Sequence, residues 1–247
     1  MTTALHPTSA RRGPVVRTVV HLGRTNLFLL TWFWVIVVTA ALLGTLALAR
    51  VNGEVGTAVI MYARHGALWF PFAQTIILLG TALRVHVANG STRRTFVRAS
   101  LVVAVGTGLA YALVLGVLAA VERTAHHAAG WGWRITDASL ADERSPLGLL
   151  LAELAVSFVA ATVVGLLVGV AYEHVGGWWG TLALPLTAGP LIGVLALLGA
   201  YGGGVPAGRS SWAAAAPTLA LALAVVVLAA VAYAALAGRL PLRPRTA

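Results

Sequence analysis

Cysteine and lysine are both absent from this chain of 247 residues, and only 10% of its residues are charged. Without cysteine the chain forms no disulfide bond. A soluble globular domain carries about 25% charged residues, so the low charge excludes an ordinary soluble enzyme. Apolar residues are abundant instead and make up 59% of the sequence.

The apolar residues gather in six long stretches. A helix that crosses a membrane needs about 20 mostly apolar residues, because each residue rises about 1.5 Å and the hydrocarbon core is about 30 Å thick. The stretches are continuously apolar rather than alternating, which favours helices over barrel strands. We therefore predict an all-α polytopic membrane protein with six transmembrane helices, at residues 27–49, 66–88, 100–121, 148–171, 178–200 and 213–237.

Arginine supplies all the permanent positive charge, and its distribution predicts the orientation. If both termini lie inside, the inner segments hold 11 of the 17 arginines. Cytoplasmic loops are enriched in arginine, so we expect a multi-pass protein of the cell membrane with cytoplasmic N and C termini. The net charge of +10 then reflects topology and contact with anionic membrane lipid. A nucleic-acid-binding protein would need a basic soluble domain, and the sequence has none, so we expect no nucleic-acid partner.

This topology divides the chain into three parts. Residues 1–26 form a cytoplasmic N-terminal segment, residues 27–237 the six-helix transmembrane domain and residues 238–247 a cytoplasmic tail. In the first part, Arg17 and Arg24 share a helical face that lies opposite several valines. This pattern predicts an amphipathic helix on the inner membrane surface, leading into the first span.

The most specific local feature is the inner segment 84–98, between the second and third spans. Asn89 and Gly90 form a strong turn signal, and Ser91 or Thr92 can cap the helix that follows. We expect a compact elbow that faces the cytosol. On charge alone, its arginines also fit an ordinary positive-inside loop.

The run Asn-Gly-Ser-Thr-Arg-Arg-Thr-Phe, placed directly after the second span, resembles a loop of ABC transporter permeases of the type-2 exporter group. The basic segment before the first span extends this resemblance, as do two further motifs: an outer loop that runs from Val-Glu-Arg to Gly-Trp-Gly-Trp, and an inner turn Tyr-Glu-His-Val-Gly-Gly. The resemblance implies that this chain forms half of a transmembrane channel. It also implies that a separate ATP-binding subunit supplies the energy.

The resemblance further implies roles for the elbow. It would dock on the ATPase, with arginines paired to acidic groups and an aromatic ring in an apolar pocket. The residues assigned to this coupling loop are Asn89, Gly90, Thr92, Arg93, Arg94 and Phe96. The sequence has no phosphate-binding loop of the G-x-x-x-x-G-K-[S/T] type, so we expect ATP on the partner and no catalytic, cofactor or metal site on this chain.

Three residues inside predicted spans are candidates for the pathway or for hinges. Glu153 either lines a pathway or reaches the membrane interface. Pro185 and Pro190 either kink a moving helix or fix a static bend.

Other functions remain open from the sequence. An ion-coupled secondary carrier needs ionisable groups in mid-membrane, and among the acids only Glu153 qualifies. The scarcity of buried charge favours export of a hydrophobic or amphipathic substrate. Six spans are few for a complete pathway, so we expect a homodimer or a heterodimer with a second permease. A non-transporting membrane scaffold would have the same hydropathy.

Overall fold

The computed structural model describes residues 14–88, 92–136, 140–199 and 211–239. In these residues the fold is all-helical, and its strand pairing is confined to one isolated bridge between Thr57 and Arg134. The elements are α1 (Pro14–Asn52), the 3-10 helix η1 (Val59–Tyr62), α2 (Ala63–Ala88), α3 (Arg93–Ala128), α4 (Leu147–Val175), α5 (Gly177–Leu182), α6 (Leu184–Thr187), α7 (Gly189–Leu197) and α8 (Trp212–Gly238).

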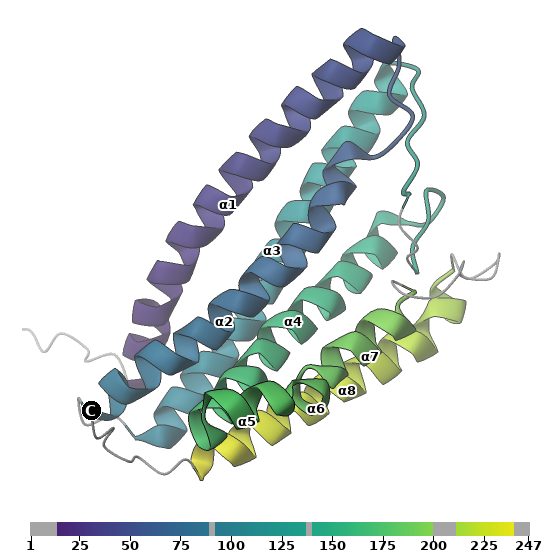
Figure 1. Ribbon diagram of the computed structural model, residues 1–247. Coiled ribbons are helices and arrows are strands. Elements are labelled where there is room, and N and C mark those ends of the chain that lie inside the picture. The colour runs from purple at the N-terminus through teal and green to yellow at the C-terminus, as the bar shows by residue number, and fades with distance from the viewer. Residues whose placement is uncertain (1–13, 89–91, 137–139, 200–210, 240–247) are drawn as a thin grey trace, which may run out of the picture.

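The long helices run side by side, and α1, α2, α3 and α4 alternate in direction, while α8 runs in the same direction as α4 (Figure 1). The end of α2 and the start of α3 lie at one end of the bundle, which we call the elbow end. The first turn of α1, the turn between α4 and α5 and the last turn of α8 lie at this end too. The opposite end, called the loop end, carries η1 and the segment between α3 and α4.

Five of the described helices, α1, α2, α3, α4 and α8, are long and apolar enough to cross a membrane. The continuous sixth helix predicted at residues 178–200 is not found. That stretch is divided into α5, α6 and α7, with Pro185 and Pro190 in the first turns of α6 and α7. Proline has no backbone N–H, so each proline removes one hydrogen bond that a straight helix would make.

Helix α1 is a single helix of 39 residues. At about 1.5 Å per residue it is about 58 Å long, roughly twice the thickness of a hydrocarbon core. Its N-terminal part continues the same helix and also contacts α3. Thr18, Leu22 and Asn26 form the buried row, and the Asn26 amide donates to the Thr107 hydroxyl on α3 over 3.5 Å. Val16, one of the valines on the helical face opposite the arginines, is 48% exposed.

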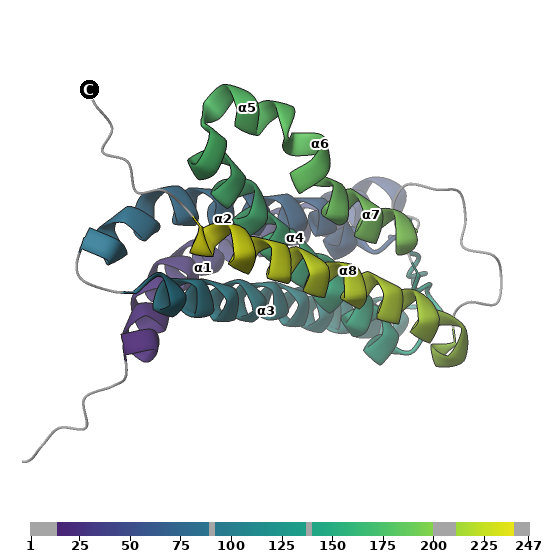
Figure 2. The same ribbon diagram turned by 90° about the horizontal axis from the view of Figure 1, so that it is seen from below.

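Helix α4 is the core of the bundle and lies between α2, α3 and α8 (Figure 2). It is apolar on every side, as expected for a buried helix. Glycines allow its neighbours to approach closely. A Cβ atom on Gly165 would lie 2.6 Å from the Phe72 carbonyl oxygen of α2, and one on Gly108 of α3 would lie 2.7 Å from the Val159 nitrogen of α4.

Candidate functional site

The predicted coupling loop is described from Thr92 onward, whereas Asn89 and Gly90 lie outside the described residues. Thr92 is the N-cap of α3: its backbone is extended, and its hydroxyl oxygen accepts from the Thr95 amide over 3.2 Å. The sequence allows Ser91 or Thr92 as the cap, and the structure has Thr92 in this position. The cap fixes where α3 begins, directly before the two arginines.

The side chains that follow the cap point in different directions. Arg94 and Arg98 are exposed, and Arg93 is half-buried. Phe96 is 0% exposed and belongs to the hydrophobic core. Its ring shares the buried face of α3 with Ser100 and Val103, so Phe96 is not presented to a partner in this conformation, and its entry into a partner's pocket stays a prediction.

Glu153 lies in the second turn of α4 and is fully buried. One carboxylate oxygen is paired with the Arg64 guanidinium at the start of α2. The other accepts from the Ala141 amide over 2.8 Å. Glu153 thus binds α2 and the α3–α4 segment to α4, with both oxygens engaged.

Arg64 is not among the site residues that the sequence predicts. In the structure it is only 6% exposed, and its Nη1 atom is buried without a hydrogen-bond partner. Its ion-pair partner is 89 positions away in the sequence. No local pattern in the sequence signals a contact over that separation.

Glu122 organises the rest of the loop end. Its carboxylate accepts from the Ile60 amide over 3.0 Å and from the Trp133 indole N–H over 3.2 Å. The Arg123 guanidinium lies 5.5 Å from the centre of the Trp133 ring, within cation–π range. The two connections at this end are thereby fastened to α3 and to each other. Trp133 is itself buried, with 6% of its surface exposed.

His126 and Asp142, also at the loop end, make local contacts. The Nδ1 atom of His126 lies 2.8 Å from the Gly132 carbonyl oxygen. Burial raises the pKa of the Asp142 carboxyl, but hydrogen bonds from the Ser145 hydroxyl and from two backbone amides, with the charge of Arg144, outweigh burial and leave that pKa lowered. In the described part of the chain, no three histidine or acidic residues group in a way that could hold a metal ion.

No family model, curated protein or solved structure matches this chain. The function must therefore be argued from the fold and its surfaces.

The broken helix α5–α7 presents the most exposed apolar surface at the elbow end. Trp178 is 74% exposed, Trp179 65% and Leu186 81%. In Figure 2, α5 and α6 form an arch that stands away from the other helices. Because Pro185 and Pro190 carry no N–H, the carbonyls of the residues four positions earlier lose their usual helical partners.

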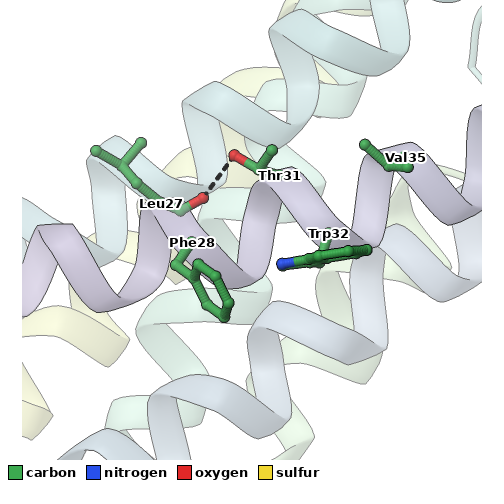
Figure 3. Close-up of a pocket in the computed structure, with 5 residues that line it drawn as sticks. All are labelled: Leu27, Phe28, Thr31, Trp32 and Val35. Atoms are coloured by element: carbon green, nitrogen blue, oxygen red, sulfur yellow. Dashed lines mark hydrogen bonds between the residues drawn. The ribbon is translucent and has the colours of Figure 1, made fainter.

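A second apolar surface lies on the outward face of α1 (Figure 3). It is an open groove of about 450 Å³, lined by Leu27, Phe28, Thr31, Trp32 and Val35. Its hydroxyl, that of Thr31, donates back to the Leu27 carbonyl over 2.9 Å. The chemistry of this groove suits the acyl chain of a membrane lipid rather than a polar ligand.

Proposed function

We propose that this chain is a permease subunit of an ABC transporter, and that a separate ATP-binding subunit drives it. The observation that carries the proposal is the start of α3, where a capped helix presents Arg94 and Arg98 to solvent beside the end of α2. An exposed basic surface at the junction of two long helices is suited to an acidic partner protein. With Phe96 buried, Thr92, Arg93 and Arg94 form the docking surface.

Helix α3 would carry the motion of the ATPase across the membrane. It is continuous from Arg93 at the elbow end to Ala128 at the loop end. Near its far end, Glu122 holds the backbone of η1 and the Trp133 side chain. A displacement of the elbow would therefore reach the outer connections through one rigid element.

Both termini would lie in the cytoplasm, with α5, α6 and α7 together forming a sixth, broken crossing. The arrangement in Figure 1 supports this topology, because the first turn of α1 and the last turn of α8 share one end of the bundle. The excess of arginine in the segments at that end supports a cytoplasmic location for it.

A second permease subunit would cover the broken crossing. Irregular backbone is tolerated at membrane depth only where protein covers it or where it lines a water-filled space. The Pro185 break lies beside the exposed Leu182 and Leu186, which the other described residues of this chain leave uncovered. A second copy facing this surface would cover the apolar side chains, and the unpaired carbonyls would line the space between the two subunits.

The cargo would be hydrophobic or amphipathic and would be exported. Ion coupling is disfavoured, because the intramembrane carboxylate of Glu153 is already neutralised by Arg64. A carrier would need this group to exchange protons or ions with water, and its 0% exposure opposes that.

Co-purification of the tagged chain in mild detergent tests the proposal. We expect the wild type to recover an ATPase subunit and the Arg93→Glu/Arg94→Glu variant to lose it. The matched control is Arg50→Glu/Arg144→Glu, which reverses two exposed arginines at the loop end and should retain the ATPase. Accessibility of a C-terminal tag verifies that no variant has inverted in the membrane. A well-folded wild type that recovers no ATPase would refute the proposal.

A further inference from the structure

Four aromatic side chains from three helices meet where α1 faces α2 and α3: Trp34 and Tyr111 are buried, and Phe70 is 36% exposed. Phe33 and Trp34 belong to α1, Phe70 to α2 and Tyr111 to α3. The Phe33 ring stacks on Phe70 with the centres 4.9 Å apart, and it lies 5.4 Å from Tyr111. The rings of Trp34 and Tyr111 are 5.7 Å apart. We call these four residues the aromatic cluster.

The aromatic cluster contains two polar atoms that have no hydrogen-bond partner. The Trp34 indole nitrogen and the Tyr111 hydroxyl are both buried and unpaired, in side chains that are 6% and 0% exposed. Both residues lie well inside predicted membrane spans, where an unpaired polar group is costly. By contrast, the hydroxyl of Tyr233, another fully buried tyrosine, lies 2.7 Å from the Ser100 hydroxyl.

The cluster lies where the bundle can open. Only 6% of the most apolar part of α1 is buried, and α1 packs chiefly on α3. Toward α2, the Phe33 side chain of α1 stacks on Phe70 and faces Gly66. Rotation of two phenyl rings would therefore open a route from the lipid to Trp34 and Tyr111 without disturbing the α2–α4 interface.

We propose that the aromatic cluster is a binding site for the neutral hydroxyl or carbonyl group of an amphipathic molecule that enters between α1 and α2. An indole N–H only donates, so the ligand must carry an acceptor, while the Tyr111 hydroxyl can donate or accept. The cluster itself contains no charged side chain, which favours a neutral group. Gln74, one turn beyond Phe70 on α2, has both amide atoms buried and unpaired, and supplies a further donor and acceptor.

This site depends on the chain lying in a membrane and not on a partner ATPase, so the test uses the purified chain alone in lipid nanodiscs. The probe is a long-chain primary alcohol that carries a photoreactive diazirine, and its competitor is the unlabelled alcohol or the alkane of equal length. We expect labelling of peptides from α1 and α3 that contain Trp34 and Tyr111. The alcohol should compete and the alkane should not.

Two variants remove the polar atoms and retain aromatic side chains: Trp34→Phe and Tyr111→Phe. Each should weaken competition by the alcohol about fivefold, the factor that corresponds to a hydrogen bond of about 1 kcal/mol. Trp212→Phe, at the start of α8 and outside both the aromatic cluster and the groove on α1, is the matched control: Trp212 is 49% exposed, and this variant should leave competition unchanged. Equal competition by alkane and alcohol, or equal labelling of all variants, would overturn the proposal.

A stability measurement without any ligand tests the same inference independently. Tyr111→Phe should raise the melting temperature or leave it unchanged, since it removes an unpaired buried hydroxyl. Tyr233→Phe should lower it, because Ser100 loses its partner. A clear loss of stability in Tyr111→Phe would show that its hydroxyl is already satisfied within the protein, and would contradict the site.

Discussion

Arg64 and Glu153 form the interaction on which the loop end most depends. The pair is buried, and Glu153 also accepts from the Ala141 amide. Removing one partner leaves a buried charge without compensation, which typically costs about 3 to 5 kcal/mol. We therefore predict that Arg64→Met and Glu153→Leu each lower the melting temperature of the purified protein strongly.

The double variant Arg64→Met/Glu153→Leu tests whether the loss of stability comes from leaving one charge of the pair without its partner. It should recover much of the loss, since replacing a whole buried ion pair by apolar residues is often tolerated. Recovery should remain incomplete, because the Ala141 amide still loses its acceptor. A direct coupling would be contradicted if the double variant lost as much melting temperature as the two single variants together.

Local pattern in the sequence predicts some single residues and fails for others. Thr92 could be named as a cap because capping depends on a few neighbouring positions. The burial of Phe96 and Trp34 depends on which helices pack together, and the burial of Trp133 depends on how the segment after α3 folds back on Glu122. The Arg64–Glu153 pair has the same origin, because its members meet only when α2 packs on α4.

At the scale of elements, the contact between α2 and α4 is set by glycine. Gly165 faces the Phe72 carbonyl and the Thr75 side chain so closely that no Cβ fits without movement. We predict that Gly165→Leu forces these helices apart and lowers both the yield of monodisperse protein and the melting temperature. The control is Gly106→Leu on an exposed part of α3, where nothing lies within 4 Å of the position that a Cβ atom would take, and which should be tolerated.

The sequence predicts the long helices well and the broken helix badly. Long apolar runs identify α1, α2, α3, α4 and α8, because length and hydropathy decide whether a helix can span a membrane. They do not reveal the division of α5, α6 and α7, since the stretch that contains Pro185 and Pro190 is as apolar as its neighbours. Prolines mark positions where a helix can kink, but neighbouring helices decide whether it bends or breaks.

For the whole molecule, the uncovered surface of the broken helix predicts a dimer. The chain has no native cysteine, so single-cysteine crosslinking in membranes is unambiguous. We expect Leu182→Cys or Leu186→Cys to give a disulfide-linked dimer under mild oxidation. The control is Leu113→Cys on α3. Leu113 is 59% exposed, but it lies outside the proposed interface, so this variant should not form a linked dimer. Crosslinking of Leu113→Cys alone would contradict the proposed interface.

The central claim is that this chain works together with an ATPase that docks at the elbow end. The most direct measurement is ATP hydrolysis by the affinity-purified assembly in lipid nanodiscs. The account predicts hydrolysis in the wild-type preparation and its loss in Arg93→Glu/Arg94→Glu, with the chain itself recovered in equal amount. A folded wild-type preparation without hydrolysis, or equal hydrolysis in both preparations, would contradict it.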